Sequence, residues 1–323
     1  MKKIIQIQGM RWSFAVLLVL AQLMLLQTGY AQDSTAVAAP EARPKLKPVK
    51  KTFQSTWLID NQSVMVSQKG TFEMDIQHRF GTVSKGYDDF WGFFAPSNIR
   101  LGVIYAPIKN LNVGLGITKS NMLWDLNAKY AIFRQTKGLY PVSLTFYANA
   151  AFDSRKDADG SIFKYPTQRG SFFNQLIVAR KINEKLSIQV AVSISHQNSV
   201  SGYYTKNDST GQEVFKEMKF NHLAVSLGAR YKLTEVTSFI FNYDQPLTKH
   251  ATNNPHPNVS FGFEFNTSNH SFQLFAGNYT LLNPQRNNLY NTNNPFGYTA
   301  ADGTKVPGGQ FVIGFNITRL WNW

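Results

Sequence analysis

The C-terminal stretch GQFVIGFNITRLWNW, residues 309–323, alternates between apolar and polar side chains. One set comprises Phe311, Ile313, Phe315, Ile317, Trp321 and Trp323, and the other comprises Gln310, Gly314, Asn316 and Thr318. Because successive side chains of a strand point to opposite faces, this stretch predicts a strand with one apolar and one polar face. A last strand that ends on aromatic residues is typical of a transmembrane β-barrel, which must close its ring and anchor at the lipid headgroups.

The N-terminus has the pattern of a secretory signal. Three cations, Lys2, Lys3 and Arg11, precede the apolar run Phe14–Leu26, and small residues follow within Thr28–Ala31. The run is shorter than the roughly 20 residues that a spanning helix needs. We therefore expect a signal peptide over residues 1–31. An uncleaved N-terminal anchor is the alternative.

The composition excludes several classes of chemistry. With no cysteine, the chain has no disulfide, no thiolate nucleophile, no cysteine metal site and no lipidated cysteine. No stretch after Ala31 is apolar over the length of a spanning helix, so a membrane protein of this sequence must cross with strands. The formal net charge is +14, but the cations are spread along the chain and form no nucleic-acid motif. We expect no nucleic-acid partner.

The chain divides into four parts. After the signal, residues 32–51 are rich in Pro and Lys, which predicts an extended periplasmic linker. Residues 52–69 form a transitional segment, and a plug, a lid and an irregular first strand are all open for it. Residues 70–323 alternate with period two and predict the barrel itself.

Twelve strands are predicted in this last part, an even number, as single-chain outer-membrane barrels require. The alternating segments lie near residues 70–81, 98–105, 111–118, 124–132, 142–149, 171–180, 186–195, 222–231, 238–244, 259–266, 271–279 and 309–323. The fold class is therefore all-β, a closed antiparallel transmembrane β-barrel of about 12 strands. A soluble β-sandwich also alternates, but it would hide the greasy face between two sheets.

The connections alternate between short and long. In the usual topology of outer-membrane barrels, the short turns lie in the periplasm and the long loops lie outside the cell. We therefore expect both termini in the periplasm, on the side of the short turns. One connection, Lys119–Met122, is short where a long loop is expected.

Several motifs resemble one family. They are GTFEMDIQHRFG (70–81), NIRLGVIYAPIKNLNVGLG (98–116), LIVARKINEKL (176–186), GARYKLT (228–234) and GFNITR (314–319). Together they resemble an uncharacterised outer-membrane β-barrel family, the domain-of-unknown-function family 5777, over nearly all of residues 52–323. The resemblance implies an outer-membrane barrel of a Gram-negative cell, and it brings no substrate, reaction or binding residue.

Nine charged residues have the parity of the barrel lumen. They are Glu73, Asp75, Arg79, Arg100, Asp125, Lys129, Arg230, Asp244 and Glu264. Charged side chains in the lumen must form ion pairs or remain hydrated. They predict either an aqueous path that selects solutes or ion pairs that fill a closed barrel. About eight strands enclose side chains only, and about sixteen leave a water channel, so the strand number leaves both open.

Enzymatic and metal chemistry have weaker support. Ser195 and His222 share lumen parity on adjacent strands, with Asp208 or Glu213 between them as an orienting acid. A polar lining is the simpler explanation of that pair, and we assign no catalytic residue. His250 and His256 lie in one loop but lack further ligands, so no metal and no cofactor is expected.

The sequence therefore favours a narrow outer-membrane pore for small polar solutes. A closed structural barrel is the alternative, docking a periplasmic or surface protein partner through its loops or its basic linker. An outer-membrane hydrolase is a third, weaker hypothesis. The expected surroundings are outer-membrane lipid.

Overall fold

The computed structural model describes residues 46–207, 209–252, 254–299 and 303–322. The predicted signal peptide, residues 1–31, and the predicted linker up to residue 45 lie outside the described residues. In the described part of the chain, no helix is long and apolar enough to cross a membrane.

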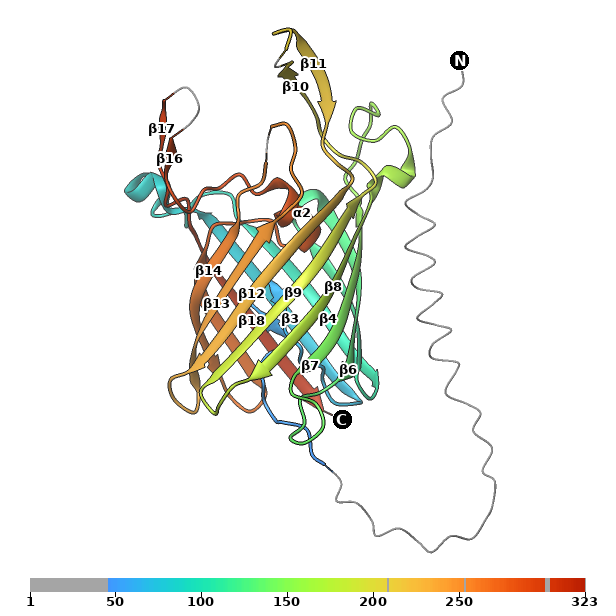
Figure 1. Cartoon of the computed structure of the whole chain (residues 1–323), viewed down its shortest axis with the longest axis vertical. Coiled ribbons are helices and arrows are strands. Elements are labelled where there is room, and N and C mark those ends of the chain that lie inside the picture. Colours follow the sequence, from blue (N-terminus) through green and yellow to red (C-terminus); the bar gives the residue numbers. More distant parts are fainter. Residues whose placement is uncertain (1–45, 208, 253, 300–302, 323) are drawn as a thin grey trace, which may run out of the picture. The chain divides into compact units, whose positions relative to one another are not determined.

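Twelve of the strands in this part form one closed antiparallel barrel (Figure 1). The wall strands are β3 (Thr71–Thr82), β4 (Asn98–Ile108), β5 (Leu111–Thr118), β6 (Leu123–Phe133), β7 (Ser143–Asp153), β8 (Gly170–Lys181), β9 (Leu186–Gln197), β12 (Asn221–Lys232), β13 (Thr237–Pro246), β14 (Asn258–Asn266), β15 (His270–Gly277) and β18 (Val312–Asn322). All twelve predicted strands are confirmed, and the sandwich alternative is excluded. β18 closes the ring by pairing with β3, with Phe315 opposite His78 and Trp321 opposite Phe72.

The remaining elements lie in connections and in the N-terminal segment. They are β1 (Trp57–Leu58), β2 (Asn61–Gln62), β10 (Gly202–Lys206), β11 (Glu213–Glu217), β16 (Tyr298–Thr299), β17 (Lys305–Val306), the 3₁₀ turns η1 (Val83–Asp89), η2 (Ser120–Met122) and η3 (Pro166–Arg169), and the helix α2 (Pro284–Tyr290). Long connections gather at one end of the barrel, the loop end, and short hairpins gather at the other, the turn end (Figure 1). The short β5–β6 connection at the loop end is the exception that the sequence also shows.

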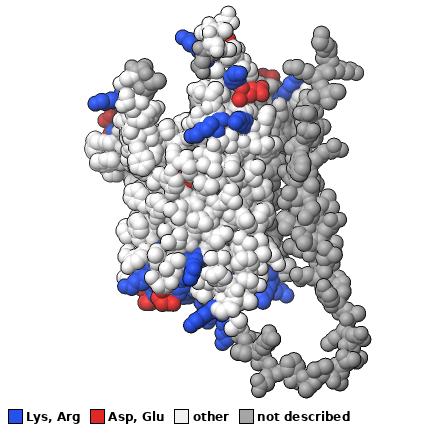
Figure 2. Space-filling view, in the orientation of Figure 1, with Lys and Arg blue, Asp and Glu red and all other residues white. Residues whose placement is uncertain are grey.

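The wall has the two faces that the alternation predicts. In β3 every second residue, from Thr71 onward, is buried and points inward, while its neighbours are more exposed. The outward residues of the wall are large and apolar, such as Leu126, Val190 and Phe263. On the face that Figure 2 shows, Lys, Arg, Asp and Glu gather at the two ends of the wall, and the zone between them is almost free of charged residues. This is the surface that a lipid-facing barrel requires.

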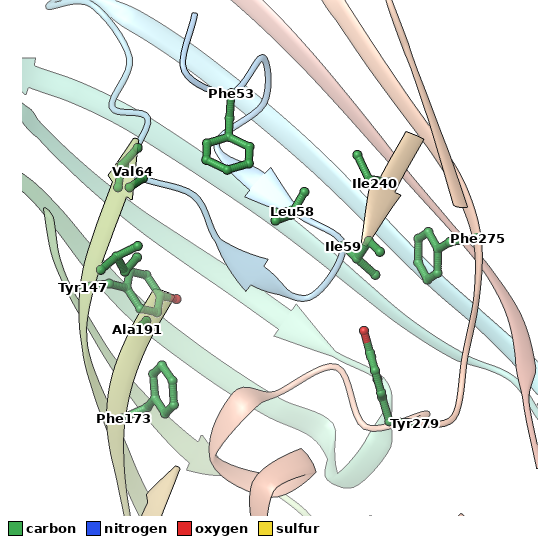
Figure 3. Packing of buried hydrophobic residues seen from close by; sticks show 12 residues of the cluster. Phe53, Leu58, Ile59, Val64, Tyr147, Phe173, Ala191, Ile240, Phe275 and Tyr279 are labelled. Carbon is green, nitrogen blue, oxygen red and sulfur yellow. The ribbon is translucent and has the colours of Figure 1, made fainter. Parts of the chain in front are cut away.

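The N-terminal segment lies inside the barrel. Its strands β1 and β2 pair as a small hairpin, with Trp57 opposite Gln62. Phe53, Leu58, Ile59 and Val64 pack against inward-facing wall residues, among them Tyr147, Phe173, Ile240 and Phe275 (Figure 3). We call residues Thr52–Val66 the plug.

Candidate functional site: the filled lumen

The plug is bound to the wall around most of the ring by hydrogen bonds. Asn61 Nδ2 donates to Asn242 on β13 at 2.9 Å and to Asp244 at 2.8 Å. On the β15 side, Gln273 accepts from the backbone N–H of Ile59 at 3.1 Å and donates to the carbonyl of Trp57 at 3.0 Å. Further plug contacts to wall side chains come from β7, β8, β9 and β18, through Thr145, Gln175, Gln189 and Asn316. The interface is therefore largely polar, with a small apolar core.

A buried ion pair fastens the turn of the plug hairpin. Asp60, between β1 and β2, binds Arg79 on β3, whose side chain is fully buried. Arg79 also donates to Asn316 Oδ1 at 3.0 Å, and its guanidinium lies 4.4 Å from the centre of the Phe275 ring. Burial raises the pKa of Asp60, and the Arg79 guanidinium opposes that rise. The negative charge of Asp60 therefore depends on its basic neighbours.

A second charged cluster lies next to the plug. Arg100 on β4 binds both oxygens of Asp125 at 2.9 Å and Asp75 at 2.7 Å. Its guanidinium lies 5.3 Å from the centre of the Trp57 ring of the plug. Glycines on the inner face give it room, because a Cβ at Gly116 would lie 2.2 Å from Arg100 Nη2. Asp125 therefore holds the guanidinium as a bidentate partner, and Asp75 adds a single charged hydrogen bond.

All nine charged residues assigned to the lumen are buried, none more than 6% exposed. Four of them bind the plug directly, namely Glu73, Arg79, Lys129 and Asp244. Asp75, Arg100 and Asp125 form the cluster beside Trp57. Arg230 and Glu264 pair with each other at 2.9 Å. Most of these charges are thus paired, and their role as the lining of a solute path stays a prediction.

The loop end is closed by the β15–β18 connection, which the sequence did not assign to the lumen. Its helix α2 lies in the mouth of the barrel (Figure 1). Gln285 donates to Asn149 on β7 at 2.7 Å, and Asn258 on β14 donates to Asn288 at 3.1 Å. Asn287 donates to Asp60 at 3.3 Å, so this cap also contacts the plug.

Little free space remains between the plug and the cap. A cavity of about 10 Å³ is lined by residues of both and of the wall, including Asp60, Arg100 and Asn287. That volume holds about one water molecule. The plug and the cap therefore leave almost no free volume at this point of the lumen.

The other candidate groups are only partly assembled. Ser195 and His222 are directly opposite on β9 and β12 and buried, yet no hydrogen bond joins them. Glu213 lies in the exposed β10–β11 hairpin, and Asp208 lies outside the described residues. The His250 ring lies near that of His222, with ring centres 4.8 Å apart and the planes tilted by 43°, and His256 contacts Tyr298 instead. Among the described residues, no three His, Cys, Asp or Glu side chains form a group that could hold a metal.

These features define a membrane-bound β-barrel whose lumen is filled by its own chain. The chain belongs to the family of the membrane-bound β-barrel domain, DUF5777, whose model matches residues 53–321. That match includes almost the whole plug, which is therefore part of the family domain. No curated protein matches the sequence.

Solved barrels are similar to this chain at low identity. The NanC porin is 10% identical, covers 78% of this chain and 99% of its own, and has a TM-score of 0.42. The CymD monoaromatic hydrocarbon channel is 8% identical, with 80% and 90% covered and a TM-score of 0.38. An outer membrane channel from Pseudomonas putida F1 is 11% identical, with 80% and 97% covered and a TM-score of 0.42.

Proposed function

We propose that the protein is an outer-membrane channel for small polar solutes, without enzymatic activity, and that the plug is its gate. In this proposal the structure described above is the closed state. We further propose that the turn end faces the periplasm, since the described chain enters the barrel and β18 ends at the end where the hairpins are short.

The polar wall behind the plug carries the proposal. The inward side chains that meet the plug are mostly amides, hydroxyls and charged groups, such as Asn242, Gln273 and Lys129. When the plug leaves, water can satisfy each of these groups, so the emptied lumen would be wet. In a permanently closed barrel, an apolar core would be more stable than this polar one, because burying ions and unpaired polar groups costs free energy.

The strand number agrees with this proposal. Twelve strands lie between the roughly eight that side chains fill and the roughly sixteen that leave an open channel. The wall side chains alone therefore leave space, and the chain fills that space with a separate segment. A segment that is joined to the wall by hydrogen bonds, and not by wall packing alone, is suited to move as a unit.

A closed structural barrel is the second candidate. It is favoured by one observation, the residual cavity of only about 10 Å³. In that case the plug would be a permanent filling, and a partner protein would bind the loops or the basic segment before residue 52. The two candidates differ in whether the plug ever leaves.

Reversible cross-linking of the plug separates them. The chain has no cysteine, so Asn61→Cys with Asn242→Cys provides one pair whose native side chains touch at 2.9 Å. A short cleavable thiol cross-linker would join them, and single-channel current would be recorded in planar bilayers before and after cleavage. We expect a silent cross-linked barrel and discrete openings after cleavage.

The matched control is a pair at the turn end, Lys181→Cys with Glu184→Cys, whose native side chains touch at 2.6 Å outside the lumen. Cross-linking there should leave the current unchanged. Silence of the cleaved protein over many insertions would favour the closed structural barrel. A current that is equal with and without the plug cross-link would show that the plug is not the gate.

A further inference from the structure

The connection between β3 and β4 exposes an unusual set of aromatic residues. Tyr87 and Phe94 are 80% and 82% exposed, and Phe90, Trp91 and Phe93 are also exposed. Their rings contact one another, with centres 5.3 Å apart for Phe90 and Trp91. Figure 1 shows this connection as the cyan turn that projects sideways from the rim of the barrel at the loop end. We call these five residues the aromatic foot.

The backbone of the foot is firmly held. Phe90 and Trp91 both have left-handed φ angles, 52° and 53°, which cost about 1 kcal/mol or more for residues with a side chain. The N–H of Trp91 donates to the Gly86 carbonyl at 2.6 Å, and Gly81 donates to the Gly92 carbonyl at 2.9 Å. A Cβ at Gly92 would lie 2.3 Å from the oxygen of Gly81. The chain thus accepts strain and close packing in order to present these rings.

The foot is continuous with the lipid-facing wall. The Phe93 ring lies 4.5 Å from the ring of Phe80, an outward residue of β3. Phe80 in turn lies 6.2 Å from Phe315 on β18, which stacks against Phe272 on β15. An aromatic track therefore runs from the foot across the outer surface of three wall strands. Because these rings continue the hydrocarbon-facing wall, we expect them to be in contact with lipid, as the wall is.

We propose that the aromatic foot is a lipid-binding surface, which inserts into the hydrocarbon edge of the leaflet on the loop side and extends the lipid contact of the barrel beyond its strands. Aromatic rings are favoured at this depth because they combine a large apolar area with tolerance of the polar interface. The charged neighbours Lys85, Asp88 and Asp89 would lie among the headgroups.

A second loop provides the contrast. Tyr204 in the β10–β11 hairpin is 71% exposed and contacts Phe215. This hairpin projects beyond the rim at the loop end (Figure 1), and the ring contact of Tyr204 with Phe215 stays within the hairpin. It therefore supplies a control residue with similar exposure and no continuity with the wall.

The test uses an environment-sensitive fluorophore on a single introduced cysteine. Phe94→Cys and Tyr204→Cys would each be labelled in the full chain and reconstituted into phospholipid vesicles, with folding checked by heat-modifiable migration on gels. The label at position 94 should emit at shorter wavelength, be quenched by nitroxide-bearing phospholipids and be protected several-fold from iodide. The label at position 204 should show the opposite behaviour.

A label at position 94 that iodide quenches as strongly as the label at position 204, without quenching by the nitroxide lipids, would overturn the proposal. That result would mean that the foot faces water and is free for a protein partner. Tyr87→Cys repeats the measurement at the other highly exposed position, in case Phe94→Cys does not fold. Channel conductance plays no part in either readout, so the result is independent of the proposed function.

Discussion

Lys129, on the wall strand β6, donates a hydrogen bond of 3.0 Å from Nζ to the backbone carbonyl of Thr56 in the plug. The same ammonium group donates to Gln62 Oε1 at 2.8 Å and to the carbonyl of Ser63 at 3.3 Å. One buried cation therefore holds the plug on both sides of its hairpin. Its three donors are all used by the segment that fills the lumen.

Replacement of Lys129 by Met should release the plug. The change keeps the length of the side chain and removes three hydrogen bonds, each worth about 1.5–3 kcal/mol when one partner is charged. We expect the fraction of time that single channels are open to rise at least tenfold. Lys109→Met, at an exposed turn position, is the control. Equal open fractions in the two variants would contradict a holding role for Lys129.

Replacement of Arg100 by Met should destabilise the barrel, because it leaves the carboxylates of Asp75 and Asp125 buried without their cation. Breaking a buried pair in this way costs about 3–5 kcal/mol. The free energy of unfolding in denaturant measures the loss. Adding Asp75→Asn and Asp125→Asn should restore a large part of it, and a triple variant as unstable as Arg100→Met would argue against the ion cluster as the cause.

An alanine at Gly116 should be poorly tolerated for the same cluster. The added Cβ would lie 2.2 Å from Arg100 Nη2 and 2.4 Å from an Asp125 oxygen, and the two carboxylates keep the guanidinium from moving away. We expect a loss of about 1–3 kcal/mol in unfolding free energy, which is typical of overpacking. Gly277→Ala, where the nearest atom is 3.2 Å away, should cost clearly less.

Plug docking should weaken as the pH rises. Burial raises the pKa of Asp60 above its ordinary value of 3.8 despite the ion pair with Arg79, so this carboxyl group takes up a proton more readily in the docked plug than in water. This contribution to docking is complete below the ordinary pKa and is lost as the pH rises through the raised pKa. Arg79, Arg100 and Asp244 face or act on the same carboxyl group. Openings should therefore be fewer in acid, and Asp60→Asn should reduce that pH dependence. An Asp60→Asn variant with the full pH dependence would exclude Asp60 as the group responsible.

Charge inside the open channel should select ions. Replacing Arg230 by Gln leaves Glu264 as an unpaired carboxylate on the inner wall. In the Lys129→Met background we expect the reversal potential in a salt gradient to shift toward cations. The paired change with Glu264→Gln should cancel the shift. A reversal potential that stays constant in all three proteins would show that this pair does not line the path.

The barrel was predictable because its signal is local. The alternation along β9, for example, fixes which of its side chains face the lumen, whatever the strand pairs with. The nine lumen charges follow from the same parity. The open or closed state of the lumen depends on contacts between distant residues, such as Ile59 with Gln273, and no local pattern encodes them.

The sequence carries only weak signals for the plug and the cap. Trp57, Leu58 and Ile59 form an apolar triplet that is followed by polar residues, which suits a strand, a lid or a plug equally. The amide-rich stretch around α2 reads as an ordinary long loop. Both segments take their places because the inner wall offers them polar partners, and those partners come together only when the ring is closed.

The position of the plug has a consequence for assembly. Its turn binds both strands of the closing seam, because Asp60 pairs with Arg79 on β3 and the carbonyl of Ile59 accepts from Asn316 on β18 at 2.7 Å. The plug therefore links the first wall strand, β3, to the last, β18. During barrel assembly, the plug would hold β3 and β18 close together while they pair. A chain without the plug would have to pair these two strands through their backbone hydrogen bonds alone.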